Sequence, residues 1–315
     1  MRIAVLDDYS NVARTFADWS SLPDCDVTVF NDHVAEEEAL ADRLRPFQIV
    51  CLMRERTAMP RSLIERLPNL RMIASTGYHN PSVDHDAARE RGVMVTGTPR
   101  ISNATPELVM GLMLALARHL VPQADLIRAG GWEFGIGRSL SGATLGILGL
   151  GNVGGRVARL ASCFGMDVVA WSQNLTPEKA AAAGVRYLDR DAFFREVDFL
   201  SIHLKLSDRT RNIVGRTELQ AMKRDAYLIN TARAQNVDME ALIEALRDGE
   251  IAGAAIDIFD VEPLPADHPY RHTDGLLITP HMGYVTRETM ANFYPDLVEA
   301  IRAFLDGREP ELRLA

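Results

Sequence analysis

Cysteine is scarce in this 315-residue chain, which has only Cys25, Cys51 and Cys163. The three are odd in number, widely separated and set among apolar residues, a pattern that argues against a disulfide framework or a cysteine-based metal site. We therefore expect reduced core thiols, no metal and a cytoplasmic protein.

Clustered positive charge and long apolar runs are also missing. The formal net charge is −9, from 34 basic and 43 acidic residues. Because phosphate contacts need clustered Lys and Arg, an acidic chain without a basic block is not expected to bind nucleic acid. No apolar run reaches the length of a membrane span, and the opening MRIAVLDDYS predicts a strand and not a signal peptide. We expect neither a nucleic-acid nor a membrane partner.

What the sequence does contain is a regular alternation of short apolar runs with segments of helical periodicity. The apolar runs form two series: residues 2–8, 27–30, 48–53, 70–76 and 92–98, then 143–151, 167–171, 197–204, 226–232, 252–259 and 275–281. Strand and helix in alternation predict a parallel sheet covered on both faces. The predicted fold class is α/β, with two doubly wound, Rossmann-like domains and a cleft between them.

Two helical segments bear on the domain boundaries. The first, ELVMGLMLALAR, is apolar nearly all round and follows the Pro- and Gly-containing segment 96–106. It is expected either to be buried between domains or subunits or to be a plain core helix. The second, residues 291–307, has no strand after it and is expected to pack back on the first domain. The predicted domains are a substrate-binding domain, 1–98 completed by 286–315, and a dinucleotide-binding domain, 99–285.

A glycine-rich segment, GILGLGNVGGRVARLA, lies between a predicted strand and a predicted helix. Gly149, Gly151 and Gly154 have the G-x-G-x-x-G spacing, which in this context predicts a dinucleotide pyrophosphate site that includes Asn152 and Val153. Gly149 allows the tight turn, Gly151 lets the pyrophosphate approach the backbone, and Gly154 lets helix and strand pack closely.

The residues that follow the predicted strand 167–171 leave open whether the dinucleotide is NAD or NADP. An acidic residue about 20 positions after the glycine loop normally holds the ribose 2′-hydroxyl. Ser172, Gln173 and Asn174 stand there instead. They bring no carboxylate to repel a 2′-phosphate and no cation to attract one. The predicted cofactor is NAD or NADP, with the hypothesis that NADP is used at least as well.

Three further predicted strand ends each carry one reactive side chain: Arg233, Glu262 and His281. His281 directly follows Pro280, at the end of what is expected to be a short buried strand. Ligands of open α/β sheets bind beyond the carboxyl ends of the strands, so the three could converge beside the nicotinamide. They suit reduction of a 2-keto acid: the imidazolium donates a proton, the carboxylate orients it, and the guanidinium grips the substrate carboxylate.

Five segments in order, GLGNVGGRVA, HLKLSDRTRNIV, NTARAQNVD, AAIDIFDVEPLP and TPHMGY, carry a family resemblance. Over essentially its whole length the chain resembles the D-isomer-specific 2-hydroxyacid dehydrogenases. That resemblance implies that Arg233 binds the substrate, Glu262 is the carboxylate partner and His281 is the acid/base. It also implies that Asp257 holds the nicotinamide amide. The further cofactor-lining residues that it implies are Thr105, His203, Thr231, Ala232 and Gly283.

The resemblance extends to a first-domain loop, STGYHNPSVD, whose backbone N–H groups are expected to hold the substrate carboxylate. Gly77 is present, Tyr78 follows, and His79 stands where the family usually has a second glycine. Arg54 aligns with a segment that faces the cleft in the family. The resemblance also implies a homodimer, formed through the apolar helix and the WEFG segment that begins at Trp132.

Two alternative functions remain open from the sequence. One is a non-catalytic nicotinamide sensor of the corepressor type, against which the presence of all three reactive residues argues. The other is a formate or phosphite dehydrogenase of the same fold, which the unusual GYHNP segment leaves possible. The leading prediction is an NAD(P)-dependent oxidoreductase that interconverts a small 2-oxo acid and its D-2-hydroxy acid.

Overall fold

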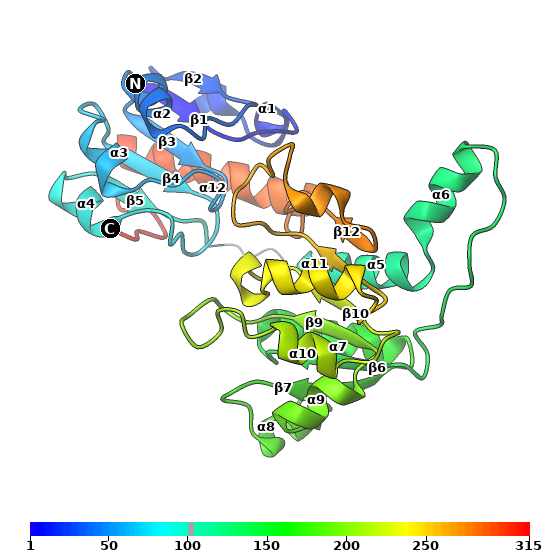
Figure 1. Cartoon of the computed structure of the whole chain (residues 1–315). Helices are drawn as coiled ribbons and strands as arrows, with labels where there is room; N and C mark the ends of the chain where they lie inside the picture. The colour runs from blue at the N-terminus through cyan, green and yellow to red at the C-terminus, as the bar shows by residue number, and fades with distance from the viewer. Residues whose placement is uncertain (100–103) are drawn as a thin grey trace. The chain divides into compact units, whose positions relative to one another are not determined.

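The computed structural model describes residues 1–99 and 104–315. The chain divides into two compact units, Met1–Ser102 with Val285–Ala315, and Asn103–Tyr284 (Figure 1). Of the predicted domain crossing at 96–106, residues 100–103 lie outside the described part of the chain.

The first unit contains a five-stranded parallel sheet in the order β2-β1-β3-β4-β5. Every residue of β3 and β4 is buried, because the sheet is covered on both faces and its inner strands must be apolar throughout. The strand bounds are β1 Arg2–Val5, β2 Asp26–Val29, β3 Ile49–Leu52, β4 Met72–Ser75 and β5 Met94–Thr96.

The helices of this unit come from both of its chain segments. The long α12 packs against α1 and β4, and the chain beyond it runs antiparallel to β5, with the Leu314 N–H donating to the Val95 carbonyl at 2.7 Å. The bounds are α1 Ala13–Phe16, α2 Glu37–Leu44, α3 Arg61–Glu65, α4 His85–Glu90, α12 Arg287–Leu305 and the 3-10 turn η1 Trp19–Ser21.

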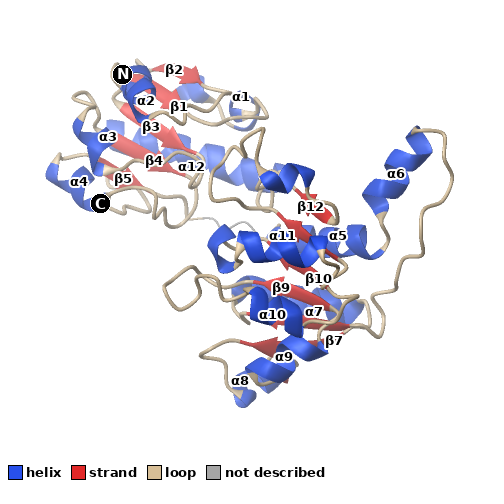
Figure 2. Ribbon diagram, viewed as in Figure 1, coloured by secondary structure: helices blue, strands red, loops and turns tan. Residues whose placement is uncertain are grey.

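The second unit contains a seven-stranded parallel sheet in the order β12-β11-β10-β9-β6-β7-β8 (Figure 2). The strand bounds are β6 Thr144–Leu148, β7 Asp167–Trp171, β8 Arg186–Tyr187, β9 Phe199–Ile202, β10 Tyr227–Asn230, β11 Gly253–Ile256 and β12 Leu276–Ile278. The prediction that β12 is buried is wrong: all three of its residues are half-buried, because an edge strand has a neighbour on one side only. The two-residue β8 was not predicted, since it is too short to show a period.

The helices of the second unit cover both faces of its sheet. Side chains of β9 and β10 alternate between two apolar cores, Phe199 and Tyr227 in one and Leu200 and Leu228 in the other, as expected for a doubly wound sheet. The bounds are α5 Thr105–Ala117, α6 Leu120–Arg128, α7 Asn152–Cys163, α8 Pro177–Ala182, α9 Arg190–Glu196, α10 Arg216–Ala221, α11 Met239–Arg247, η2 Ala234–Asn236 and η3 Pro269–His272.

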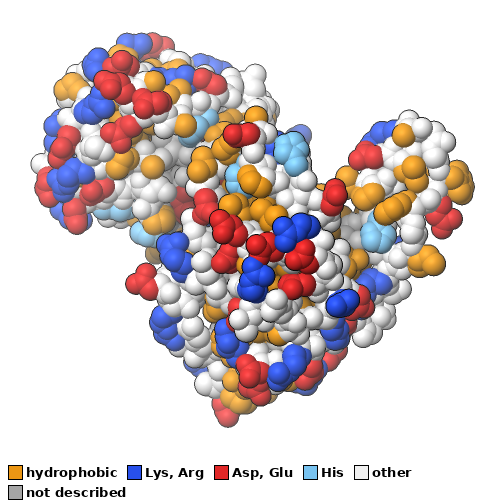
Figure 3. All heavy atoms as spheres, in the orientation of Figure 1, with side chains coloured by type: hydrophobic (Ala, Val, Ile, Leu, Met, Phe, Trp, Pro, Cys, Tyr) orange, Lys and Arg blue, Asp and Glu red, His pale blue; other side chains and the backbone are white. Residues whose placement is uncertain are grey.

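The apolar helix α5 packs against α7, β10 and β11, so it is a core helix of its own unit. The segment that follows α5, comprising α6 and the loop after it, leaves large apolar side chains exposed on the molecular surface (Figure 3). They are Leu120, Val121, Ile127, Trp132, Phe134 and Ile136, and we call them the arm residues.

The cysteines differ from the prediction of three core thiols. All three are free, but only Cys51 is buried, whereas Cys25 is half-buried and Cys163 is exposed at the end of α7. Burial raises the pKa of the Cys51 thiol. Within 1–99 and 104–315, no helix is both long and apolar enough to cross a membrane, and no group of three or more His, Cys, Asp or Glu could hold a metal ion.

Candidate active site

The glycine loop lies where β6 gives way to α7. Gly149 has a φ of +104°, and its N–H donates to the Trp171 carbonyl at 3.0 Å, so the loop is tied to the neighbouring strand β7. A Cβ at Gly154 would lie 2.2 Å from the Gly149 carbonyl oxygen, a separation that real atoms do not adopt. Only glycine at position 154 therefore allows the first turn of α7 to lie so close to the loop.

Open space lies beside the same loop at Gly151, where no described atom apart from Gly151 and its chain neighbours comes within 4 Å of the position of a Cβ. Asn152 and Val153 begin α7 directly after it and are exposed. The first N–H groups of a helix have no partner within the helix and attract negative charge. A tight glycine turn, open space and a helix N-terminus together fit a pyrophosphate.

The loop after β7 contains Ser172, Gln173 and Asn174, and the structure places a cation beside it. Gln173 Nε2 donates to the Arg209 carbonyl at 2.9 Å, and Arg209 Nη2 lies 3.5 Å from Asn174 Oδ1. Ser172, Gln173 and Asn174 bring no cation of their own, as predicted, but the prediction omitted Arg209, which the fold brings beside them. The order β9-β6-β7 explains the omission: the loop that carries Arg209 follows β9, and β9 and β7 flank β6 on its two sides.

His203 directly follows β9 and lies beside the glycine loop. Its carbonyl oxygen would be 3.0 Å from a Cβ at Gly149, and its Nε2 is 2.9 Å from Ser201 Oγ. Burial lowers the pKa of His203 to about 3. The imidazole is therefore neutral near pH 7 and serves as a packing and hydrogen-bonding group there.

The three reactive side chains follow three neighbouring strands. β10, β11 and β12 are paired in parallel, and their ends align so that Arg233, Glu262 and His281 all follow the same edge of the sheet. His281 Nδ1 lies 2.6 Å from Glu262 Oε2, and the two side chains are 26% and 22% exposed. Glu262 Oε1 accepts a hydrogen bond from the Phe259 N–H at 2.9 Å, which holds the carboxylate in place.

A buried carboxylate shapes the turn that carries His281. Asp257 Oδ1 accepts from the Thr279 hydroxyl at 2.6 Å and from the Met282 N–H at 2.9 Å, and its Oδ2 accepts from the Gly283 N–H at 2.9 Å. Burial raises the pKa of Asp257, although these hydrogen bonds act in the opposite direction. His281 itself has a φ of +50°, so the turn after Pro280 departs sharply from the strand direction.

The segment after β10 is braced by Asn230, which is 1% exposed. Its Oδ1 accepts from the Ala232 N–H at 3.0 Å, and its Nδ2 donates to the Arg233 carbonyl at 2.9 Å. Thr231 Oγ1 is buried with no hydrogen-bond partner among the described residues. Thr105, at the start of α5, is linked to the turn after His281, since its hydroxyl donates to the Gly283 carbonyl at 3.0 Å.

The predicted substrate residues of the first unit lie around Gly77. A Cβ at Gly77 would be 1.8 Å from Arg54 Nη1, so the Arg54 guanidinium rests against the glycine backbone. The Gly77 N–H already donates to Thr98 Oγ1 at 2.7 Å. Tyr78 is 60% exposed, and the His79 ring is stacked on His85 with centroids 6.0 Å apart.

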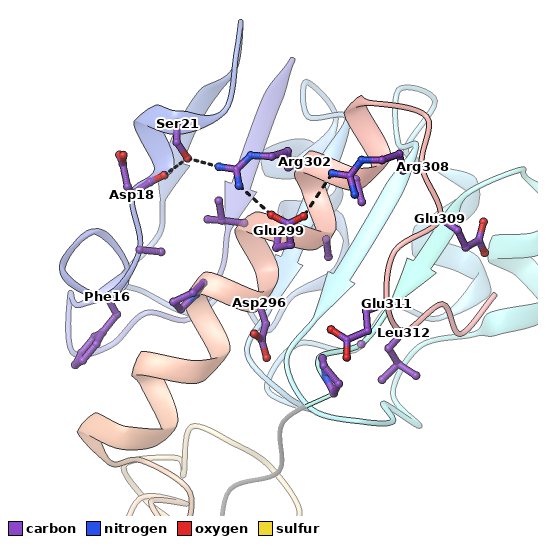
Figure 4. A pocket seen from close by; sticks show the side chains of 17 residues that line it. Phe16, Asp18, Ser21, Asp296, Glu299, Arg302, Arg308, Glu309, Glu311 and Leu312 are labelled. Carbon is purple, nitrogen blue, oxygen red and sulfur yellow. Dashed lines mark hydrogen bonds and ion pairs between the residues drawn. The ribbon is translucent and has the colours of Figure 1, made fainter.

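A separate cavity of about 660 Å³ lies within the first unit, between α12, residues 16–21 and the segment after α12 (Figure 4). Three of its charged groups pair with one another, since Glu299 binds Arg302 at 2.9 Å and Arg308 at 3.4 Å. None of the predicted catalytic or cofactor residues lines it. The candidate active site is therefore the carboxyl edge of the second unit's sheet, and the Gly77 loop of the first unit is described separately from it.

Comparison with known proteins agrees with this geometry. The family model described as "D-isomer specific 2-hydroxyacid dehydrogenase, NAD binding domain" matches residues 110–283. The chain belongs to this family. It is 38% identical over 258 residues to a glyoxylate reductase of Aeropyrum pernix, covering 79% of this chain and 77% of that one. It is 36% identical over 282 residues to a hydroxypyruvate reductase of Thermotoga maritima, covering 88% and 90%.

Among solved structures, a phosphoglycerate oxidoreductase of Vibrio cholerae is similar with a TM-score of 0.92 and 38% identity, covering 98% of this chain and 99% of that one. The predicted family, the α/β fold with two parallel sheets and the nicotinamide dinucleotide cofactor are thus confirmed. The 2-hydroxyacid dehydrogenase is an oxidoreductase of 2-oxo and 2-hydroxy acids.

Proposed function

We propose that this dehydrogenase interconverts a small 2-oxo acid and its D-2-hydroxy acid, with His281 as the acid/base. The observation that carries the proposal is the 2.6 Å contact between His281 Nδ1 and Glu262 Oε2, at the strand edge that Arg233 shares. The nicotinamide dinucleotide supplies or accepts the hydride. The side chains of the protein manage the proton and the charges.

The proton is assigned to Nε2 of His281. Because Glu262 engages Nδ1, the carboxylate fixes the orientation of the ring and leaves Nε2 to face the substrate. In the reducing direction Nε2 donates its proton to the carbonyl oxygen, and in the oxidising direction it takes the proton from the hydroxyl group. The Phe259 N–H on the second oxygen of Glu262 keeps the carboxylate from rotating away.

Substrate binding is assigned to a guanidinium and a loop. Arg233 would grip the substrate carboxylate in a two-pronged hydrogen bond and polarise the carbonyl group. From the first unit, Arg54 and the loop of Gly77, Tyr78 and His79 are proposed to add donors for the same anion. Because the Gly77 N–H is already bonded to Thr98, the N–H groups of Tyr78 and His79 are the better candidates in that loop.

The residues proposed to hold the dinucleotide lie around the glycine loop after β6 and at the ends of the other strands of the second unit. The glycine loop would bind the pyrophosphate, and Oδ2 of Asp257, which accepts one hydrogen bond in the structure, would take a second from the nicotinamide amide. The complete proposed set is Thr105, Gly149, Gly151, Asn152, Val153, Gly154, Ser172, Gln173, Asn174, His203, Thr231, Ala232, Asp257 and Gly283.

The proposed substrates are glyoxylate and hydroxypyruvate, because the similar proteins of A. pernix and T. maritima carry those activities in their names. The proposed domains are 1–98 with 286–315 for substrate and 99–285 for the dinucleotide. A homodimer is proposed through the arm residues, since exposed apolar groups such as Ile136, at 94% exposure, are typical of an interface.

The test is a panel of 2-oxo acids with both reduced cofactors, followed by variants of the three reactive residues. His281→Ala, Glu262→Ala and Arg233→Ala are each expected to reduce turnover by about 100-fold or more. Cofactor affinity should stay within about twofold, because none of the three is assigned to the dinucleotide. His272→Ala removes an exposed histidine of η3 and serves as the matched control. Near-normal glyoxylate or hydroxypyruvate reduction by His281→Ala would rule out the acid/base assignment.

The same panel separates the alternatives. A nicotinamide sensor would bind the dinucleotide and turn over none of the oxo acids. A formate or phosphite dehydrogenase would instead produce reduced cofactor from formate or phosphite.

A further inference from the structure

Two loops meet beside the glycine loop, and neither contains the acid that usually selects NAD. We call residues 172–174 the ribose loop and residues 203–215 the β9–α10 loop. The ribose loop follows β7, which pairs with β6, and the β9–α10 loop follows β9, which pairs with β6 on the other side. Gln173 Nε2 donates to the carbonyl of Arg209 at 2.9 Å, so the two loops are directly joined.

The β9–α10 loop is folded on itself in a way that presents Arg209. The Thr210 hydroxyl donates to the Lys205 carbonyl at 2.7 Å, and the Ser207 N–H donates to Thr210 Oγ1 at 2.8 Å. With the Gln173 bond, these contacts fix the backbone on both sides of Arg209. The guanidinium is exposed and lies over the ribose loop, with Nη2 at 3.5 Å from Asn174 Oδ1.

Arg209 also keeps its charge available. Within residues 1–99 and 104–315, no carboxylate lies within ion-pairing distance of it, in contrast to Arg186, which pairs with Asp167 at 2.7 Å. The acids nearest in sequence on either side are Asp208, which is exposed, and Glu218, which pairs with Arg190. Arg209 is therefore a cation beside the ribose loop with no acidic partner in the described part of the chain.

We propose that Arg209, together with the ribose loop, binds the 2′-phosphate of NADP(H) and sets the cofactor preference of this dehydrogenase. The inference rests on the proposed cofactor placement, in which the pyrophosphate lies on the glycine loop. A guanidinium matches the oxygens of a phosphate with two parallel hydrogen bonds, and Ser172 adds a hydroxyl group where an acid would repel the phosphate. NAD(H) offers only a 2′-hydroxyl here and gains nothing from the cation.

The experiment measures equilibrium binding of NADPH and NADH to the full chain by fluorescence titration, without substrate. Arg209→Gln is expected to weaken NADPH binding by about 10- to 100-fold, because it removes charge-assisted hydrogen bonds to the phosphate. NADH binding should change by less than about twofold. Arg211→Gln, which removes an exposed arginine two positions further along the same loop, is the matched control and should leave both affinities unchanged.

Two further variants sharpen the result. Arg209→Lys keeps the charge without the two-pronged geometry and should restore part of the NADPH affinity. Ser172→Asp places an acid at the ribose position and should reverse the preference in favour of NADH. The effect of Arg209→Gln should also shrink as salt is added, because the guanidinium is exposed and screened.

The outcomes distinguish this inference from the proposed function. If Arg209→Gln leaves NADPH binding intact, or weakens NADPH and NADH equally, the assignment of Arg209 is overturned. If the unsubstituted chain binds neither dinucleotide, the cofactor placement itself fails.

Discussion

Two adjacent glycines of α7 allow a sharp test of how the glycine loop is built. Gly154 and Gly155 lie in the same helical turn, but their surroundings differ completely. A Cβ at Gly154 would be 2.2 Å from the Gly149 carbonyl oxygen and 3.0 Å from Ile147 Cγ2. A Cβ at Gly155 would meet nothing within 4 Å beyond its chain neighbours and the backbone of its own helix.

Replacing each of the two glycines with alanine separates two effects on stability, the gain in helix propensity and the cost of a steric clash. Replacing glycine with alanine inside a helix stabilises it by about 0.5–1 kcal/mol, and this gain is common to both variants. Gly154→Ala must in addition displace the Gly149 carbonyl, since backbone cannot swing aside as a side chain can. Overpacking of this kind costs about 1–3 kcal/mol. Gly155→Ala should therefore be more stable than the parent chain, and Gly154→Ala less stable than Gly155→Ala by about 1–3 kcal/mol.

The assay is urea denaturation followed by tryptophan fluorescence, together with NADH titration of the folded protein. Displacement of the Gly149 carbonyl would also distort the proposed pyrophosphate site, so Gly154→Ala should bind NADH at least about tenfold more weakly. Gly155→Ala should bind NADH as the parent does. Equal stability and equal NADH affinity in the two variants would refute the claim that Gly154 is required for the close approach of helix and loop.

Three other predictions follow from the described contacts. The pKa of His203 is lowered from 6.5 to about 3, so its contribution to stability is complete above pH 6.5 and declines as pH falls towards 3. Between pH 7.5 and 5.5 the free energy of unfolding should fall by about 1.4 kcal/mol because of His203. In urea denaturation, His203→Gln should abolish this part of the pH dependence, and a variant with the same pH dependence as the parent would contradict the assignment. Asp257→Asn should destabilise the chain by about 1–3 kcal/mol, because the amide NH₂ would face an N–H group that now donates to a carboxylate oxygen. The measurement is thermal unfolding, and an unchanged midpoint would show that the turn does not need the carboxylate. A double variant, Trp132→Ala with Ile136→Glu, should convert the proposed dimer to a monomer in light scattering, whereas a parent chain that is already monomeric would exclude the dimer.

The strands of both units could be predicted from sequence because parallel sheets covered on two faces need continuous apolar runs. The apolar runs did not show the order of the strands in each sheet or which strands lie at its edges. β12 is as apolar as the inner strands, yet it is half-buried because it lies at the edge of its sheet. Cys163 lies among apolar neighbours in sequence but faces solvent at the end of α7, since helical position decides exposure there.

The candidate site was partly predictable for the same reason. Arg233, Glu262 and His281 follow strands that are neighbours in space as well as in chain order, so their common edge could be expected from the alternation of strands and helices. Arg209 could not be found this way, because its approach to Asn174 depends on the strand order β9-β6-β7, which runs against chain order. The hydrogen bonds of Asp257 were equally hidden, since they join residues on either side of β12 through a folded turn.

The discontinuous make-up of the first unit has a consequence during synthesis. Its helix α12 supplies Phe293, Tyr294 and Leu297, each at most 2% exposed, to a unit whose remaining chain outside 285–315 precedes residue 103. At a translation rate of about 5–20 residues per second, the ribosome needs about 10–40 s to pass from residue 102 to residue 285. The second unit can fold within that interval, while the partners of α12 on α1 and β4 wait uncovered. The nascent first unit therefore exposes apolar surface until α12 has been synthesised.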